Sequence, residues 1–120
     1  MLALAALALG VVAQSAPDDG SWGKELPGNI LSQAITPDDY PIESLKRGEV
    51  GDVKFGVVVG ADGLVKSCSI LRSSGSQRLD TQTCRIMQAR LRFKPAHDSQ
   101  GSPVEDRFSG DINWVLNPRW

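Results

Sequence analysis

The stretch that decides the fold is residues 51–72, GDVKFGVVVGADGLVKSCSILR. Over residues 51–59 apolar side chains alternate with other residues, which is the period-two pattern of a strand with one buried face. The Asp-Gly pair at 62–63 then supplies the positive φ angles that a tight turn requires. A return strand is expected over residues 64–72, with Cys68 and Ile70 on one face. The stretch therefore predicts a β-hairpin.

Helical patterns lie on both sides of this hairpin. Residues 42–47 predict a short helix that ends at Gly48, and residues 77–90 predict an amphipathic helix with one apolar stripe. A final strand is expected over residues 105–116, and residues 97–103 read as a polar loop. The order helix, strand, strand, helix, strand predicts a small α+β domain with helix covering one face of a sheet.

Composition excludes several classes of function. The chain has 120 residues, which is room for one modest domain, and 13 Lys+Arg against 14 Asp+Glu, a net charge of −1. A protein that binds nucleic acid through phosphate contacts normally carries a basic excess, so no nucleic-acid partner is expected. With one His and two Cys, a zinc site is implausible. His97 is the sole histidine and therefore the sole candidate base for a triad enzyme, and no nucleophile motif such as GxSxG accompanies it. We therefore expect no catalysis, and we expect no cofactor.

The N-terminal residues predict export. Residues 1–13 carry no charge and are shorter than the about 20 residues needed to cross a bilayer. They resemble the apolar part of a signal peptide with a cleavage site near Ser15. No basic residue stands at their start, so either the true start lies upstream or the signal is a weak one. A buried helix and a retained anchor are the alternatives. Residues 1–15 are therefore assigned to a signal peptide or short hydrophobic segment. Residues 16–36 are assigned to a flexible arm, either a linker or a loosely docked segment whose large apolar anchors are Trp22 and Leu26.

The expected compartment decides the expected state of the two cysteines. In an oxidising space Cys68 and Cys84 are expected to form a disulfide. Two free, buried thiols are the alternative. A redox-active pair normally has two residues between its cysteines, and this spacing does not occur in the chain.

The chain contains a series of short motifs in a fixed order and spacing. They are Tyr40-Pro41, Arg47-Gly48, Gly51-x-Val53, Asp62-Gly63-x-Val65, Ser73-Ser74-Gly75, Leu79-Asp80, Arg92-Phe93-x-Pro95-Ala96 and Ile112-x-Trp114. Together they resemble the C-terminal domain of TonB proteins over residues 37–117, and Cys68 and Thr83-Cys84 are similar to a subgroup of that family with an added cysteine pair. The domain is accordingly placed at residues 37–120.

The resemblance implies a periplasmic domain with a three-stranded antiparallel sheet packed on two helices. It also implies a mechanism, strand addition, in which the TonB box of an outer-membrane transporter for siderophores or cobalamin pairs with the edge of the last strand. An edge strand offers unpaired N–H and C=O groups, which supports that mechanism independently. Tyr40 and Pro41 match the motif at the entrance of the domain. The residues that match the binding strand are Phe108, Ser109, Gly110, Asp111, Ile112, Asn113, Trp114, Val115 and Leu116.

Some of these residues have a second expected role. The side chains of Ile112, Trp114 and Leu116 are expected to pack into the core, which is compatible with a backbone that forms an edge.

The pairs Asp18-Asp19 and Asp38-Asp39 do not have the pattern of a calcium loop. Capping or solubility is their expected role, and no metal is expected.

The resemblance leaves the transport role open, because the sequence shows no long apolar anchor or Pro-rich spacer. A link to inner-membrane motor proteins would then pass through another subunit. The alternative function is a secreted, self-associating or envelope-scaffold domain, either a homodimer through the same edge or a binder of anionic glycan or lipid through the arginines of residues 72–94.

Overall fold

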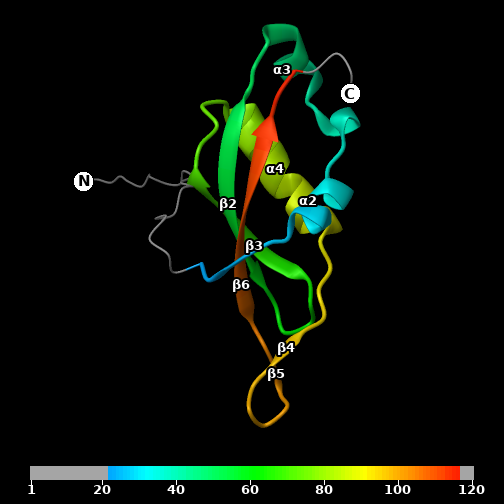
Figure 1. The fold of residues 1–120 in the computed structure, drawn as a ribbon, viewed down its shortest axis with the longest axis vertical. Coiled ribbons are helices and arrows are strands. Elements are labelled where there is room, and N and C mark those ends of the chain that lie inside the picture. The colour runs from blue at the N-terminus through cyan, green and yellow to red at the C-terminus, as the bar shows by residue number, and fades with distance from the viewer. Residues whose placement is uncertain (1–21, 117–120) are drawn as a thin grey trace, which may run out of the picture.

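The computed structural model describes residues 22–116 (Figure 1). The expected signal peptide and residues 117–120 lie outside the described residues. The elements in chain order are β1 (Lys24–Glu25), α2 (Gly28–Ala34), a 3-10 turn (Pro37–Asp39), α3 (Ile42–Arg47), β2 (Gly51–Val59), β3 (Val65–Arg72), α4 (Gln77–Arg90), β4 (Ala96–His97), β5 (Pro103–Val104) and β6 (Asp106–Trp114).

The main sheet has the strand order β1-β6-β2-β3. β2 is antiparallel to both of its neighbours, β3 and β6, which confirms the expected antiparallel sheet. The hairpin turn is closed by a hydrogen bond of 2.8 Å from the Gly60 amide to the Leu64 carbonyl, and Gly63 has a φ of 84°. The expected sheet of three strands is extended by β1, which pairs with β6 in the parallel direction.

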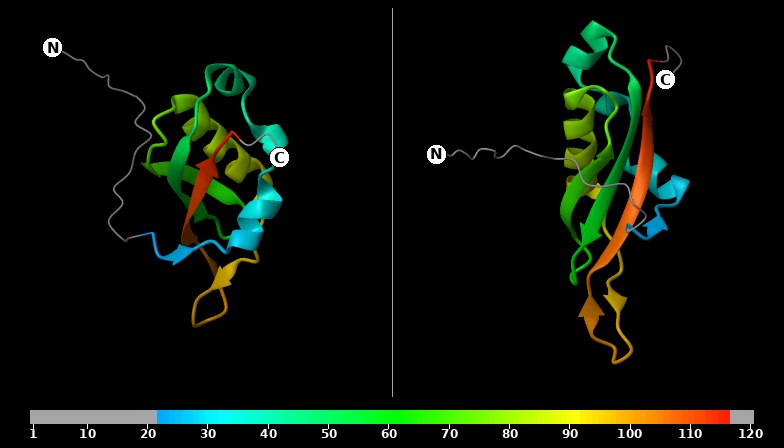
Figure 2. Two further views of the ribbon diagram at one scale, coloured as in Figure 1. Left: turned by 45° about the horizontal axis from the view of Figure 1, so that its top comes forward. Right: turned by 90° about the vertical axis from the view of Figure 1, so that its left-hand side faces the viewer.

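The core lies between one face of this sheet and α4. Val53, Phe55 and Val57 of β2 alternate along the strand and are fully buried. Leu79 and Met87 of α4 are buried as well, and Figure 2 shows this helix lying along one face of the sheet. Burying a side chain of this size stabilises the fold by about 1.5–3 kcal/mol. The apolar alternation seen in the sequence is therefore the inner layer of the domain.

Most of the expected flexible arm is part of the fold. We call residues 22–35 the strap: they contain β1 and α2, and they lie against β6 (Figure 1). Trp22 and Leu26 are buried. Trp22 packs on Gly56, where an added Cβ would lie 2.5 Å from the indole Cε3. Because that contact joins residues far apart in the sequence, local pattern alone gave no sign of it.

Two further differences concern the elements around the core. The strap contributes α2 as a third helix beside the two that were expected. The expected polar loop at residues 97–103 is instead a small hairpin, because β4 and β5 pair through Ala96 with Val104 and His97 with Pro103.

Candidate interaction site at the last strand

β6 forms the candidate site, and its two long flanks differ. On one flank all nine residues pair with β2, from Asp106 opposite Val59 to Trp114 opposite Gly51. On the other flank the Ser109 carbonyl accepts a hydrogen bond of 2.7 Å from the Leu26 amide. Backbone groups of successive residues in a strand point to opposite flanks. Asp111 and Asn113 therefore direct their N–H and C=O groups outward, as Ser109 does.

The outer flank is occupied over part of its length. β1 pairs there with Phe108 and Ser109 only. Within residues 22–116 no other strand pairs with this flank. A cavity of about 350 Å³ lies beside the open part. It is lined by Ile35, Thr36, Pro37, Ile112, Asn113 and Trp114.

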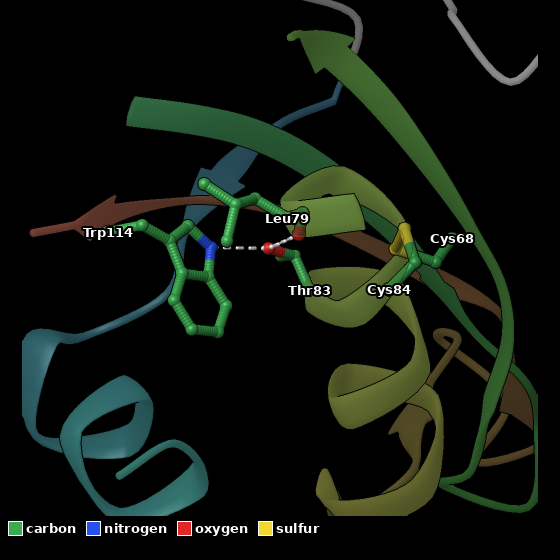
Figure 3. Close-up of a disulfide and its surroundings, with 5 residues drawn as sticks. All are labelled: Cys68, Leu79, Thr83, Cys84 and Trp114. Atoms are coloured by element: carbon green, nitrogen blue, oxygen red, sulfur yellow. Dashed lines mark hydrogen bonds between the residues drawn. A yellow bond between two sulfur atoms is a disulfide. The ribbon is translucent and has the colours of Figure 1, made fainter. Parts of the chain in front are cut away.

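Two side chains near the end of β6, those of Ile112 and Trp114, belong to the core. Trp114 is 1% exposed, and its Nε1–H donates a hydrogen bond of 2.9 Å to Thr83 Oγ1. That hydroxyl donates in turn to the Leu79 carbonyl at 2.8 Å, so the buried indole and the buried hydroxyl are both satisfied (Figure 3). Ile112 is also buried. Leu116, which was expected to be in the core, is 43% exposed because β6 ends at Trp114.

The Tyr40-Pro41 motif supports the end of β6. The Tyr40 ring meets the Trp114 ring edge-on, with 5.1 Å between their centroids. Its hydroxyl donates to the carbonyl of Glu49, and burial raises the pKa of Tyr40. Pro41 precedes α3 in an extended conformation. The motif thus holds the end of the strand in place from the core side.

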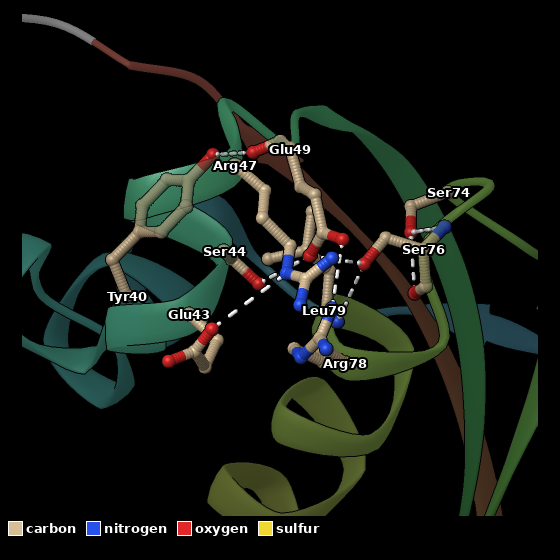
Figure 4. A network of polar contacts seen from close by, with 9 residues as sticks. All are labelled: Tyr40, Glu43, Ser44, Arg47, Glu49, Ser74, Ser76, Arg78 and Leu79. Atoms are coloured by element: carbon tan, nitrogen blue, oxygen red, sulfur yellow. Dashed lines mark hydrogen bonds and ion pairs between the residues drawn. The ribbon is translucent and has the colours of Figure 1, made fainter.

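Sequence reasoning did not identify Glu49, whose carboxylate joins α3 to the start of α4 (Figure 4). It accepts hydrogen bonds from Ser44 Oγ at 2.7 Å and Ser76 Oγ at 3.1 Å, and Arg78 Nη1 lies 2.8 Å away. The Ser44 hydrogen bond is the largest cause of the lowered pKa of Glu49. Two of its partners, Ser76 and Arg78, lie 27 and 29 residues along the chain, so its local sequence carried no signal.

A second ion pair connects the 3-10 turn that follows the strap to α4. Arg90 donates to both carboxylate oxygens of Asp39, at 2.7 and 2.8 Å, and to the Ala34 carbonyl at 2.8 Å. The hydrogen bond from Arg90 lowers the pKa of Asp39 to about 2. Asp39 also accepts from the Thr36 amide at 2.8 Å, which confirms the capping role expected for this stretch. Arg78 and Arg90 thus have carboxylate partners, which weakens the idea of an arginine surface for anionic ligands.

The disulfide and the candidate catalytic residue lie away from the β6 edge. Cys68 of β3 and Cys84 of α4 form the expected bond, with 5.6 Å between their Cα atoms. His97 lies in β4. Among residues 22–116 no three His, Cys, Asp or Glu side chains lie together as metal ligands would, and no helix in that range is long and apolar enough to span a membrane.

Comparison with known proteins supplies the remaining finding. The family model described as "Gram-negative bacterial TonB protein C-terminal" matches residues 36–116. Among solved structures, the chain is similar to the solution NMR structure of the Pseudomonas aeruginosa TonB CTD. The sequence identity is 27%, the match covers 68% of this chain and 80% of that chain, and the TM-score is 0.53. No curated protein sequence matches the chain.

Proposed function

The chain belongs to the TonB C-terminal family, and from that premise we propose that it binds an extended segment of an outer-membrane transporter along the outer flank of β6. Domains of this family are periplasmic parts of energy-transducing proteins, contact outer-membrane transporters and have no known catalytic activity. In the proposed complex the transporter segment adds a strand to the sheet. The binding residues are those of Phe108–Leu116.

The observation that supports this proposal is the outward direction of the backbone groups of Asp111 and Asn113. A partner strand satisfies such groups with main-chain hydrogen bonds, and pockets along the edge then select its side chains. The mostly apolar cavity next to Asn113 is placed to take one such side chain. β3 is the other outer strand of the sheet. We favour β6, because residues 108–116 are those that match the binding strand of the family.

The wider biological role is part of the same proposal. The chain acts in the periplasm after export, with residues 1–15 as the leader and residues 37–120 as the binding domain. The transporters are those of siderophores or cobalamin, and another subunit supplies the connection to the inner-membrane motor. Self-association through an open edge is the competing function, and a protein concentration series in sedimentation without peptide separates the two.

The experiment that tests strand addition is a proline substitution at Asn113. Asn113→Pro removes one outward N–H and leaves the hydrogen bonds to β2, because proline is compatible with the open flank of an edge strand. Asn113→Ala is the control, since it removes the side chain and keeps the N–H. Each variant is titrated with a synthetic TonB-box peptide, with chemical shifts of backbone amides as the readout.

We expect Asn113→Ala to bind like the wild type and Asn113→Pro to bind at least about tenfold more weakly, which corresponds to the loss of one main-chain hydrogen bond worth roughly 1.4 kcal/mol. Both variants should melt cooperatively. A wild-type titration without any shift in residues 105–116, or equal binding by the proline variant, would contradict the proposal.

A further inference from the structure

We propose that the strap is a built-in competitor of the partner strand: β1 occupies the Ser109 part of the β6 edge, and a partner gains the whole edge only by displacing it. This inference rests on the proposed function, because it assumes that the partner adds to the same flank. It adds a regulatory step that is set by residues of this chain outside the matched family domain, which begins at residue 36.

The first argument is the length of open edge. With β1 in place, the outward groups of Asp111 and Asn113 are the ones left between Ser109 and the end of β6 at Trp114. Strands in globular proteins usually have about 5–6 residues. A partner of ordinary length that starts at Asn113 therefore reaches Ser109, whose carbonyl is already bonded to the Leu26 amide. Partner and β1 compete for this acceptor.

The second argument is how lightly β1 is held. Its main-chain pairing covers two residues, Lys24 and Glu25. The ion pair between Lys24 and Asp106 is 2.7 Å long, but the Lys24 side chain is 64% exposed, and exposed ion pairs contribute little to stability. Segments with so few paired groups open locally at much lower cost than the strands of the core. β1 can therefore leave while the sheet stays intact.

The third argument identifies what retains the strap. The Trp22 ring lies on Gly56, on the face of the sheet opposite α4, and Arg107 stacks over the ring at 5.2 Å. Leu26 is 6% exposed. Leu26 remains as a second anchor, so removing the Trp22 contact should weaken the hold on β1 without a change in any group that the partner would bind. Trp22 is therefore the residue whose contact the experiment removes.

Two variants remove this contact in different ways. Trp22→Ala deletes the ring. Gly56→Ala keeps the ring but places a Cβ 2.5 Å from it, so that Trp22 must move. Gly28→Ala is the control, because nothing lies within 4 Å of a Cβ added at that strap position. All are made in the full chain and titrated with the same synthetic TonB-box peptide.

When the competent state is a small fraction of the molecules, the apparent Kd is the intrinsic Kd divided by that fraction. We therefore expect Trp22→Ala and Gly56→Ala to bind the peptide about tenfold more tightly than the wild type and Gly28→Ala to bind equally. Equal binding by all four proteins overturns the proposal that the strap competes with the partner, while leaving the proposed function intact. Peptide binding by none of them overturns both.

Amide hydrogen exchange of the wild type gives a second readout that needs no variant. On addition of peptide, the Leu26 amide should lose protection while the amides of Asp111 and Asn113 gain it. A bound peptide with unchanged protection at Leu26 contradicts displacement. This result stands even if Trp22→Ala or Gly56→Ala fails to fold.

Discussion

The two flanks of β6 show how one strand serves both the core and an interface. Toward β2 all nine of its residues are paired, whereas toward β1 the pairing covers two. The side chain of Trp114 is locked in the core by Tyr40 and Thr83. The outward backbone groups of neighbouring Asn113 have no strand partner within residues 22–116. Because side chains and backbone groups point in perpendicular directions, burial of the first does not close the second.

The same contrast separates the strap from the rest of the domain, residues 36–116, which we call the body. The body is held by long strand pairs and by a disulfide. The β1 part of the strap is held by two paired residues, whereas α2 packs on the core cluster through Ala34. Damage to the body should therefore lower the free energy of global unfolding. Damage to the exposed contacts of β1 should mainly change local opening. The predictions below test this contrast, beginning with the largest expected effect.

Removal of the disulfide should have the largest effect on the body. For Cys68→Ser with Cys84→Ser we expect a loss of about 3 kcal/mol in unfolding free energy, because the unfolded chain is no longer constrained by a loop with a sequence separation of 16. Urea denaturation measures it. The reduced wild-type protein is the control and should lose a similar amount. A loss below about 1 kcal/mol would show that the bond is not a main support of the body.

Loss of the buried Thr83 hydroxyl, which accepts the hydrogen bond from Trp114, should have the next largest effect on stability. Thr83→Val leaves the indole N–H without its acceptor in the core, and a buried unsatisfied group costs about 1–3 kcal/mol. Thr83→Ser keeps the acceptor and loses only a methyl group, so it is the matched control. In urea denaturation the unfolding free energy should be highest for the wild type, lower for Thr83→Ser and lowest for Thr83→Val. If valine were as stable as serine, the hydrogen bond would not contribute.

The ion pair between Asp39 and Arg90 lies where the strap meets the body. The folded-state pKa of Asp39 is lowered from 3.8 to about 2. The stability that this carboxylate contributes is thus present above pH 4 and is lost as the pH falls toward 2. Because the Arg90 side chain is 46% exposed and screened by solvent, we expect Asp39→Asn to lose only about 1 kcal/mol at pH 7.

Urea denaturation of wild type and Asp39→Asn at pH 7 and pH 2 measures this effect. The gap between the two proteins should close at the lower pH. Arg90→Gln serves as the control, because it removes the partner and should reproduce the loss at pH 7. A gap that stays constant with pH would assign the effect to a cause other than the charge of Asp39.

The smallest effect is expected within the strap. Lys24→Gln breaks the exposed ion pair with Asp106 and should change global stability by less than about 0.5 kcal/mol. Hydrogen exchange at the Leu26 amide should nevertheless become faster, because β1 opens more often. Exchange at the Ile112 amide, which points toward β2, is the internal control. Equal acceleration at both amides would mean that strap and body unfold together.

Local pattern predicted the body well. The alternation over residues 51–59 and the apolar stripe over residues 77–90 each specify a face, and the structure has β2 and α4 with those bounds. Both elements bury one regular face, so periodicity within a single segment is enough to find them. The Cys68–Cys84 bond was expected from compartment and number.

The sequence allowed a docked arm with Trp22 and Leu26 as anchors, but β1, α2 and the place where the strap docks were missed for a physical reason. β1 has two residues, too few for any period, and its place depends on contacts with Gly56 and Ser109 far along the chain. The same limit applies to Asn113: the sequence predicted a strand there, but which flank its N–H faces follows from the register with β2 and β1. The Glu49 network also joins distant elements, so no single segment revealed it.

The most direct test of strand addition at β6 is amide hydrogen exchange with and without a synthetic TonB-box peptide. The account predicts new protection at Asp111 and Asn113, whose amides point to the outer flank. It predicts no change at Ile112, which already pairs with β2, or at residues 65–72 of β3. New protection along β3 with none at Asp111 and Asn113 would contradict the account.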